Sequence, residues 1–241
     1  MPKHRYQQYC ALARALDVAG DRWTLLIVRE LIPGSRRFTD LIDGLQGISR
    51  NLLTERLRDL EREGIVTRQE LRPPAARQVY ELTDEGRDLA AAVMPLIAWG
   101  TRRMHQRAPS DTFHPRWAAV AMSVLANRDA AKGVTETYQF VIGRTAFHFV
   151  IDDGAIHVRD GFAEDPAVTW TTDANTWADI VAGKLTPPAA AEAGNLTTHG
   201  EPKAENRFRQ IFSRTQMLTR AQANGNRKRP TGSNRRRSKP K

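Results

Sequence analysis

Apolar residues recur at helical spacing through most of residues 9–107. Leu12, Leu16 and Ala19 predict a short amphipathic helix over residues 9–19. Further helices are expected over 22–31, 38–45, 50–63 and from about 84 to 106, with Asp21, Ser49, and Thr83 or Asp84 as candidate N-caps. Pro33-Gly34 and Gly64 end two of these helices. The front of the chain is therefore predicted to be mainly helical.

The apolar period changes from helical to alternating directly after the fourth helix. Residues 65–71 and 78–83 are expected to be strands, joined by the stiff basic connector Arg72-Pro73-Pro74-Ala75-Ala76-Arg77. The helices over 37–45 and 49–63 meet at a short turn bearing Gly47, which makes them a helix-turn-helix candidate. Because a two-stranded hairpin follows at once, residues 1–107 are predicted to form a winged helix-turn-helix DNA-binding domain.

A second module is predicted over residues 108–220, after a linker-like segment at 107–115. Its pattern predicts an α+β fold with an antiparallel sheet. Strands are expected over 135–142, 145–151, 155–159, 167–172 and 195–199, and helices over 116–127, from Asp173 to Gly183, and over 201–212. The whole chain is thus assigned to the α+β class, with two domains and a tail.

Charge is concentrated at the C-terminal end of the chain. The net charge is +10, and residues 221–241 contain eight basic and no acidic side chains. This tail is predicted to be disordered, because its composition of Arg, Lys, Asn and Gly cannot form a packed core. It is expected to add DNA phosphate contacts beside the specific site, the alternative being a tail that only aids solubility.

The sequence offers little for catalysis or for a metal. The six histidines show no ligand spacing, and Cys10, the single cysteine, can build neither a disulfide framework nor a structural zinc site. No phosphate-binding loop or nucleophile-elbow motif occurs. We therefore expect no enzyme activity, no catalytic residues, no metal and no cofactor. Without a transmembrane stretch or signal peptide, a cytoplasmic protein with no membrane partner is expected.

Six motifs of the front module carry a family resemblance. They are Tyr9-Cys10, Gly20-Asp21-Arg22-Trp23-Thr24-Leu25-Leu26-Ile27, Arg37-Phe38-Thr39-Asp40-Leu41, Gly47-Ile48-Ser49, Leu53-Thr54-Glu55-Arg56-Leu57-Arg58-Asp59-Leu60-Glu61-Arg62-Glu63-Gly64 and Tyr80-Glu81-Leu82-Thr83-Asp84-Glu85-Gly86. With these motifs the module resembles the HxlR family of bacterial transcription factors over roughly residues 5–105. It departs from the family at Ala11, where the family usually has proline after the cysteine. The resemblance implies a homodimeric winged helix-turn-helix protein whose first and last helices form the dimer contact.

The outer face of the helix over 50–63 supplies the candidate base contacts. Stepping about 100° per residue from Leu53 places Leu57 and Leu60 on the core side. The N-terminal turns of a recognition helix enter the major groove, so Asn51, Thr54, Glu55 and Arg58 are the candidates for base edges. The alternative for each is an ordinary solvated side chain.

Six further residues are candidates for the DNA backbone. Arg50 and Arg62 flank the base-reading face, and Arg36 and Arg37 begin the preceding helix. Arg72 and Arg77 flank the prolines of the wing, where a stiff basic loop suits phosphate or minor-groove contact. Ser49 is expected either to cap its helix or to touch a phosphate.

Cys10 is a candidate redox or electrophile sensor. Some relatives of the HxlR family use a thiol at the dimer contact in this way, and Arg14 lies one helical turn further on. The alternative is a small buried apolar residue.

Four runs of the second module carry another family resemblance. They are Val168-Thr169-Trp170-Thr171-Thr172-Asp173, Trp177-Ala178-Asp179-Ile180-Val181-Ala182-Gly183-Lys184-Leu185, Leu196-Thr197-Thr198-His199-Gly200 and Phe208-Arg209-Gln210-Ile211-Phe212. With these runs the module is similar to the type-two sterol carrier protein domain. The similarity implies an apolar cavity between sheet and helices, for which Phe140, Phe149, Trp170 and Trp177 are candidate lining residues; a packed core without a cavity is the alternative.

These features together predict a sequence-specific transcriptional regulator. We expect a homodimer that binds double-stranded DNA at a palindromic operator and responds to an apolar small-molecule effector. One rival is a carrier or sequestering protein for lipids or other apolar ligands, whose front domain only dimerises. Another is a nonspecific DNA-binding protein led by its basic tail, which predicts equal affinity for all sequences.

Overall fold

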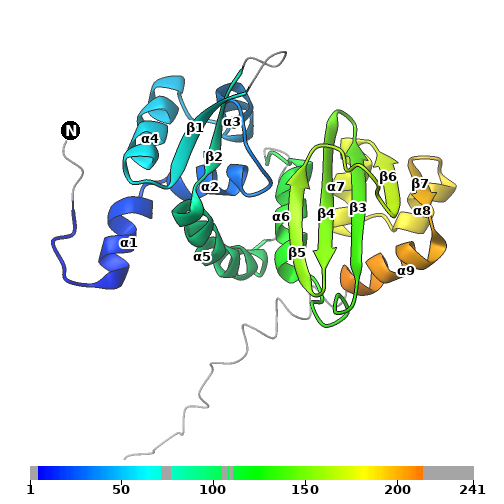
Figure 1. The fold of residues 1–241 in the computed structure, drawn as a ribbon. Helices are drawn as coiled ribbons and strands as arrows, with labels where there is room; N and C mark the ends of the chain where they lie inside the picture. Colours follow the sequence, from blue (N-terminus) through cyan, green and yellow to red (C-terminus); the bar gives the residue numbers. More distant parts are fainter. Residues whose placement is uncertain (1–4, 72–76, 105–107, 109–110, 214–241) are drawn as a thin grey trace, which may run out of the picture.

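The front module is a winged helix-turn-helix, as predicted. The computed structural model describes residues 5–71, 77–104, 108 and 111–213, so the predicted tail lies outside the described residues. The elements of the front module follow each other along the chain in the expected order (Figure 1). They are α1 (Ala11–Ala19), α2 (Thr24–Leu31), α3 (Phe38–Gly44), α4 (Arg50–Arg62), β1 (Val66–Leu71), β2 (Arg77–Leu82) and α5 (Asp84–Thr101).

Helix α4 is fixed by its cap and by one apolar stripe. The Ser49 hydroxyl accepts a hydrogen bond from the Leu52 backbone N–H at 3.2 Å, so Ser49 is the predicted N-cap. Leu53, Leu57 and Leu60 are at most 2% exposed, which confirms the core face. Packing this stripe against α2 and α3 turns the opposite side of α4 outward.

The hairpin β1–β2 is antiparallel and is joined to the turn before α3. Val66 pairs with Leu82 at its base, and a separate bridge links Tyr80 to Arg36. In this bridge the Arg36 N–H donates to the Tyr80 carbonyl at 2.8 Å, and the Tyr80 N–H donates to the Arg36 carbonyl at 2.7 Å. The wing is thereby held to the helix-turn-helix by main-chain hydrogen bonds.

The second module has a five-stranded sheet in the order β5-β4-β3-β6-β7. Its sheet is mixed, which corrects the expectation of an antiparallel sheet, because β3 and β6 pair in parallel. Alternation in the sequence identifies strands but not their order, and here the chain crosses from the edge strand β5 to the far side of β3. The elements are α6 (Pro115–Leu125), β3 (Thr135–Ile142), β4 (Thr145–Asp152), β5 (Ala155–Asp160), β6 (Val168–Thr172), α7 (Ala174–Ala182), α8 (Pro187–Glu192), β7 (Leu196–Gly200) and α9 (Pro202–Ile211).

Aromatic side chains fill the space between this sheet and its helices. Phe140 lies at the centre, stacked on Trp170 with ring centroids 4.9 Å apart and in edge contact with Phe149 at 5.8 Å. Trp177 from α7 and Phe208 from α9 complete the contacts of Phe140, at 5.2 and 5.5 Å. Such offset and edge-on arrangements stabilise a core beyond the area they bury.

The two modules pack directly against each other. Helix α6 contacts α2 and α5 on one side and β4, β5 and α7 on the other, and Figure 1 shows it between the winged module and the sheet. Ile32 and Ile97 of the front module are in contact with both apolar cores. The linker-like segment before α6 therefore leads into a second module that packs against the first.

Three details differ from the sequence predictions. Helix α2 begins at Thr24 with Trp23 as N-cap, because the Asp21 carboxylate instead pairs with Arg56 at 3.0 Å. Helix α5 ends at Thr101, before the predicted limit near residue 106. Helix α8 was not predicted; its N-cap is Thr186, which precedes two prolines, a pattern typical of a helix start.

Two glycines of α5 should respond in opposite ways to alanine. A Cβ on Gly86 would lie 2.0 Å from the Ile65 carbonyl oxygen, whereas a Cβ on Gly100 would meet nothing within 4 Å. Gly86→Ala should therefore lower the free energy of unfolding by about 1–3 kcal/mol. Gly100→Ala should raise it by roughly 0.5–1 kcal/mol, because alanine favours the helix. Urea unfolding followed by circular dichroism checks both; equal midpoints would contradict this packing.

Candidate nucleic-acid interface

The outer face of α4 is polar and accessible. Asn51, Glu55 and Arg58 are exposed, while Leu53 and Leu57 on the opposite side are buried. Figure 1 shows α4 on the side of the front module away from the sheet, so the second module does not cover this helix. The face thus has the shape and chemistry of a recognition helix.

The predicted base-contact residues differ in whether their side chains already have partners within the protein. In the described part of the chain, the side chains of Asn51 and Arg58 have no hydrogen bond or ion pair. The Thr54 hydroxyl donates to the Arg50 carbonyl at 2.9 Å, which keeps it within the helix. Glu55 lies 3.8 Å from the guanidinium of Arg56, an exposed and weak contact. Of the four, Asn51 and Arg58 are therefore the ones whose side chains are exposed and have no protein partner in the described residues.

The predicted phosphate contacts at the ends of α4 are also accessible. Arg50 is exposed, and its guanidinium lies 5.9 Å from the ring centroid of Phe38 at the start of α3. Arg62 is exposed and pairs with Asp59 at 2.6 Å. Ser49 was predicted either to cap its helix or to touch a phosphate, and its hydroxyl acts as the cap.

Arg37 and Arg36, adjacent in sequence, have opposite surroundings. Arg37 is exposed at the N-terminus of α3, where its backbone N–H donates to Asp40 at 3.2 Å. Arg36 is 4% exposed, and its Nη1 lies 3.3 Å from an Asp160 carboxylate oxygen of the second module. The prediction of a phosphate contact by Arg36 is therefore wrong for this arrangement, because the second module covers its side chain.

The wing tip is outside what the structure describes. Arg72 falls in the segment 72–76, and only the backbone of Arg77 is described, as the first residue of β2. Their phosphate contacts stay predictions. The strands that support them are in place: Val79 is buried, and Leu82 anchors β2 in the front core.

An ion-pair cluster that sequence analysis missed stabilises the position of α4. Nη1 of Arg56 lies 3.0 Å from Asp21 and 2.9 Å from Asp59, and the Arg56 side chain is 18% exposed. The link to Asp21 joins α4 to the turn before α2. The Arg56–Asp59 pair could have been predicted from its i, i+3 spacing on a helix. Asp21 is distant in sequence, so no local pattern predicts its contact with Arg56.

The four candidate pocket residues gather around Phe140, whose ring contacts those of the other three. Phe140, Phe149, Trp170 and Trp177 are at most 6% exposed and belong to a single core. The indole N–H of Trp177 has no hydrogen-bond partner in the described residues. A buried donor without an acceptor is costly, so an acceptor brought by a ligand would stabilise this site.

Cys10 is exposed at the N-cap position of α1. The cysteine is therefore not buried within its own chain. Its role as a sensor stays a prediction.

Polar contacts at the domain interface bring together residues that sequence analysis did not single out. The Trp117 indole donates to the buried Glu30 carboxylate at 2.6 Å, and the Arg29 guanidinium lies 4.2 Å from the Trp117 ring centroid. Partial burial lowers the pKa of His114, whose ring packs 4.6 Å from that of Trp117. The side chains of α6 thus extend into the base of the helix-turn-helix.

In the described residues, no three or more His, Cys, Asp or Glu side chains group so that they could hold a metal ion. None of the described helices combines the length and apolar character needed to cross a membrane.

The fold and the exposed face of α4 define a winged helix-turn-helix protein. The chain belongs to the HxlR-like helix-turn-helix family, whose model matches residues 18–108. Residues 121–213 match the SCP-2 sterol transfer family. Both resemblances inferred from the sequence are thereby confirmed.

Individual relatives agree with this assignment. The HTH-type transcriptional regulator YvaP of Bacillus subtilis is 39% identical over 88 residues, covering 36% of this chain and 82% of YvaP. Rv3095 of Mycobacterium tuberculosis, also an HTH-type transcriptional regulator, is 44% identical over 97 residues, covering 40% and 60%. The chain thus spans about 60% of the length of the first curated relatives it matches. The reduced form of YodB from Bacillus subtilis is a similar solved structure, 31% identical over 42% of this chain and all of YodB, with a TM-score of 0.36.

Removal of Arg58 should change sequence preference. Arg58→Ala deletes an exposed guanidinium from the outer face of α4, so affinity for a preferred site should fall by about 1–3 kcal/mol and preference at one base pair should relax. Binding titrations on matched and single-base-substituted duplexes measure this. Arg144→Ala, which removes an exposed charge from the β3–β4 turn, is the control. Unchanged affinity and preference for Arg58→Ala would rule out this face.

Proposed function

We propose that this protein is a sequence-specific transcriptional regulator that binds a palindromic operator as a homodimer and responds to an apolar ligand. The observation that carries the proposal is the outer face of α4, where Asn51 and Arg58 are exposed without partners in the described residues. Asn pairs bidentately with adenine and Arg with guanine, so this face offers direct readout. Family membership supports the same function.

Dimerisation is supported by apolar side chains on α1 and α5 that are exposed in the single chain. Leu12 is 66% exposed on α1, and Leu96 and Trp99 are 47% and 46% exposed on α5. Large apolar side chains exposed in a single chain often mark an interface, and a second copy would cover them. A dimer of this kind places two recognition helices on successive turns of the major groove.

Ligand response is supported by the second module. Its match to a sterol transfer family and its aromatic core suit an apolar molecule, and the unpartnered Trp177 N–H suits an acceptor atom on that molecule. Phe140, Phe149 and Trp170 are the neighbouring rings that would line the site. Since these rings now touch one another, ligand entry requires them to separate.

The proposal is tested by a gel shift with the full chain. DNA sites selected from a random pool by the protein should be two-fold symmetric, with half-sites about 10–10.5 base pairs apart or a multiple of this. Excess competitor DNA should not remove the shifted band. A carrier whose front domain only dimerises predicts no specific band, and a nonspecific binder predicts equal affinity for all sequences.

The paired substitutions Leu12→Glu and Leu16→Glu should convert the dimer to a monomer. Two buried charges at the interface would be unpaired, and specific DNA binding should be lost with the dimer. Analytical ultracentrifugation and the gel shift measure the two effects. Phe162→Glu is the matched control, since Phe162 is 74% exposed on the second module. A double variant that stays dimeric would contradict the assigned interface.

Ligand binding is tested with a fluorescent long-chain fatty acid as probe. Saturable binding is expected, and Trp170→Ala should weaken it because a ring of the lining is lost. Trp99→Ala, on α5 and outside this module, should leave it unchanged. Affinity for the selected DNA should change when the probe is bound, provided that the probe prefers one of two states. Absence of saturable binding, or equal loss in both variants, would reject this part of the proposal.

A further inference from the structure

Arg36 connects the two parts of the front module that face DNA. It directly precedes Arg37, the N-cap of α3, and its backbone pairs with Tyr80 of the wing strand β2 in both directions. A shift of Arg36 therefore moves the start of α3 and the base of the wing together.

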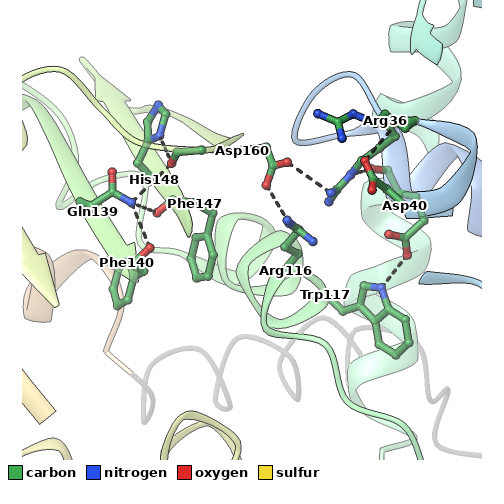
Figure 2. A network of polar contacts seen from close by, with 12 residues as sticks. Arg36, Asp40, Arg116, Trp117, Gln139, Phe140, Phe147, His148 and Asp160 are labelled. Atoms are coloured by element: carbon green, nitrogen blue, oxygen red, sulfur yellow. Dashed lines mark hydrogen bonds and ion pairs between the residues drawn. The ribbon is translucent and has the colours of Figure 1, made fainter. Parts of the chain in front are cut away.

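The side chain of Arg36 leaves its own module and enters the domain interface. Its Nη1 lies 3.3 Å from Oδ2 of Asp160, and Oδ1 of the same carboxylate accepts from Arg116 Nε at 2.7 Å (Figure 2). The Asp160 backbone N–H donates to the Pro33 carbonyl at 3.0 Å. One residue of β5 thus binds both the Arg36 guanidinium and the loop that leads to it.

Charge makes Asp160 the essential member of this group. The Arg36 side chain is 5% exposed, and burial, together with the nearby Arg116, lowers its pKa. Without the carboxylate, the buried Arg36 guanidinium would face Arg116 and lose its ion pair, keeping only the hydrogen bond from its Nε to the Glu30 carbonyl at 3.4 Å and the charges of Glu30 and Asp40 nearby. Loss of the one ion-pair partner of a buried charge is strongly destabilising, so we expect Arg36 to shift.

Asp160 is also tied to the aromatic core of the second module. The carbonyl of the next residue, Gly161, lies 3.2 Å from His148 Nδ1 and accepts from Gln139 Nε2 at 3.4 Å. The buried Gln139 also donates to the carbonyls of Phe140 and Phe147, at 2.9 Å each. Hydrogen bonds therefore connect the backbone of Phe140, one of the candidate lining residues, through Gln139 to the residue that follows Asp160; Figure 2 shows Phe140, Gln139 and Asp160.

We propose that Asp160 is a positioning residue for DNA binding, through which the second module sets the placement of α3 and the wing by holding Arg36. The inference rests on the proposed DNA-binding function. It gives the second module a part in DNA recognition, because Asp160 belongs to that module and not to the helix-turn-helix.

The test compares Asp160→Asn with two matched variants in the full chain. Asp160→Asn keeps the shape and removes the charge. Glu136→Gln makes the same charge change at another partly buried ion pair of the second module, where Arg207 Nε lies 3.0 Å from Glu136. Arg116→Gln changes the same interface but leaves the Arg36–Asp160 pair. Dissociation constants are measured on the selected site and on unrelated DNA, and amide hydrogen exchange is followed at Tyr80.

Asp160→Asn should weaken binding to the selected site roughly 5- to 150-fold, the usual range of coupling between sites. Binding to unrelated DNA should be unchanged, because the exposed phosphate-binding charges are untouched. The Tyr80 amide should exchange faster, since its acceptor is the Arg36 carbonyl. Glu136→Gln and Arg116→Gln should match the wild type in both measurements.

Several outcomes would overturn the inference. Wild-type affinity and Tyr80 exchange in Asp160→Asn would show that Asp160 does not position Arg36, and equal effects in the Glu136→Gln control would show general destabilisation. Loss of selected-site binding in Arg116→Gln equal to that in Asp160→Asn would assign the effect to the interface as a whole.

A second variant keeps the test decisive if Asp160→Asn does not fold. Asp160→Glu displaces the carboxylate by one methylene and is tested by the same criteria. If the wild type selects no site, the proposed function fails; if it selects one and Asp160→Asn binds it normally, only this inference fails.

Discussion

Burial of one leucine stripe on α4 is the constraint on which the candidate DNA interface depends. Leu53, Leu57 and Leu60 fill the front core, and a helix that buries this side must turn the side about 180° away to solvent. Fully burying a leucine side chain stabilises by about 1.5–3 kcal/mol, far more than an exposed ion pair contributes. Burial of the three leucines therefore determines that Asn51 and Arg58, on the opposite side of the helix, point to solvent.

The same stripe explains why the recognition face was predictable from the sequence. Helical periodicity, a Ser cap and a Gly stop are local signals, and each was observed at α4 within one residue. The wing was predictable for a similar reason, since alternating residues on either side of a basic connector favour a hairpin. Local patterns thus defined the elements of the front module and the exposure of most of its candidate residues.

Features that depend on partners distant in sequence were not predictable. Arg36 and Arg37 look alike in the sequence, yet only Arg36 is buried, because Asp160 lies 124 positions further along the chain and reaches it through the domain interface. Asp21 resembled a helix cap and is instead a partner of Arg56. The parallel pairing of β3 with β6 was likewise not predictable. Strand order depends on where the chain crosses over the sheet, and the alternation of apolar and polar residues does not reveal this.

The domain interface combines apolar packing with polar contacts that have little tolerance for change. Ile32 and Ile97 join the two cores and would accept small shifts, because apolar packing is not directional. The Trp117–Glu30 hydrogen bond and the Arg36–Asp160 pair are directional and mostly buried, so each is either made or lost. An interface of this composition has few intermediate arrangements. A change within the second module that moved β5 would therefore affect the helix-turn-helix through discrete contacts.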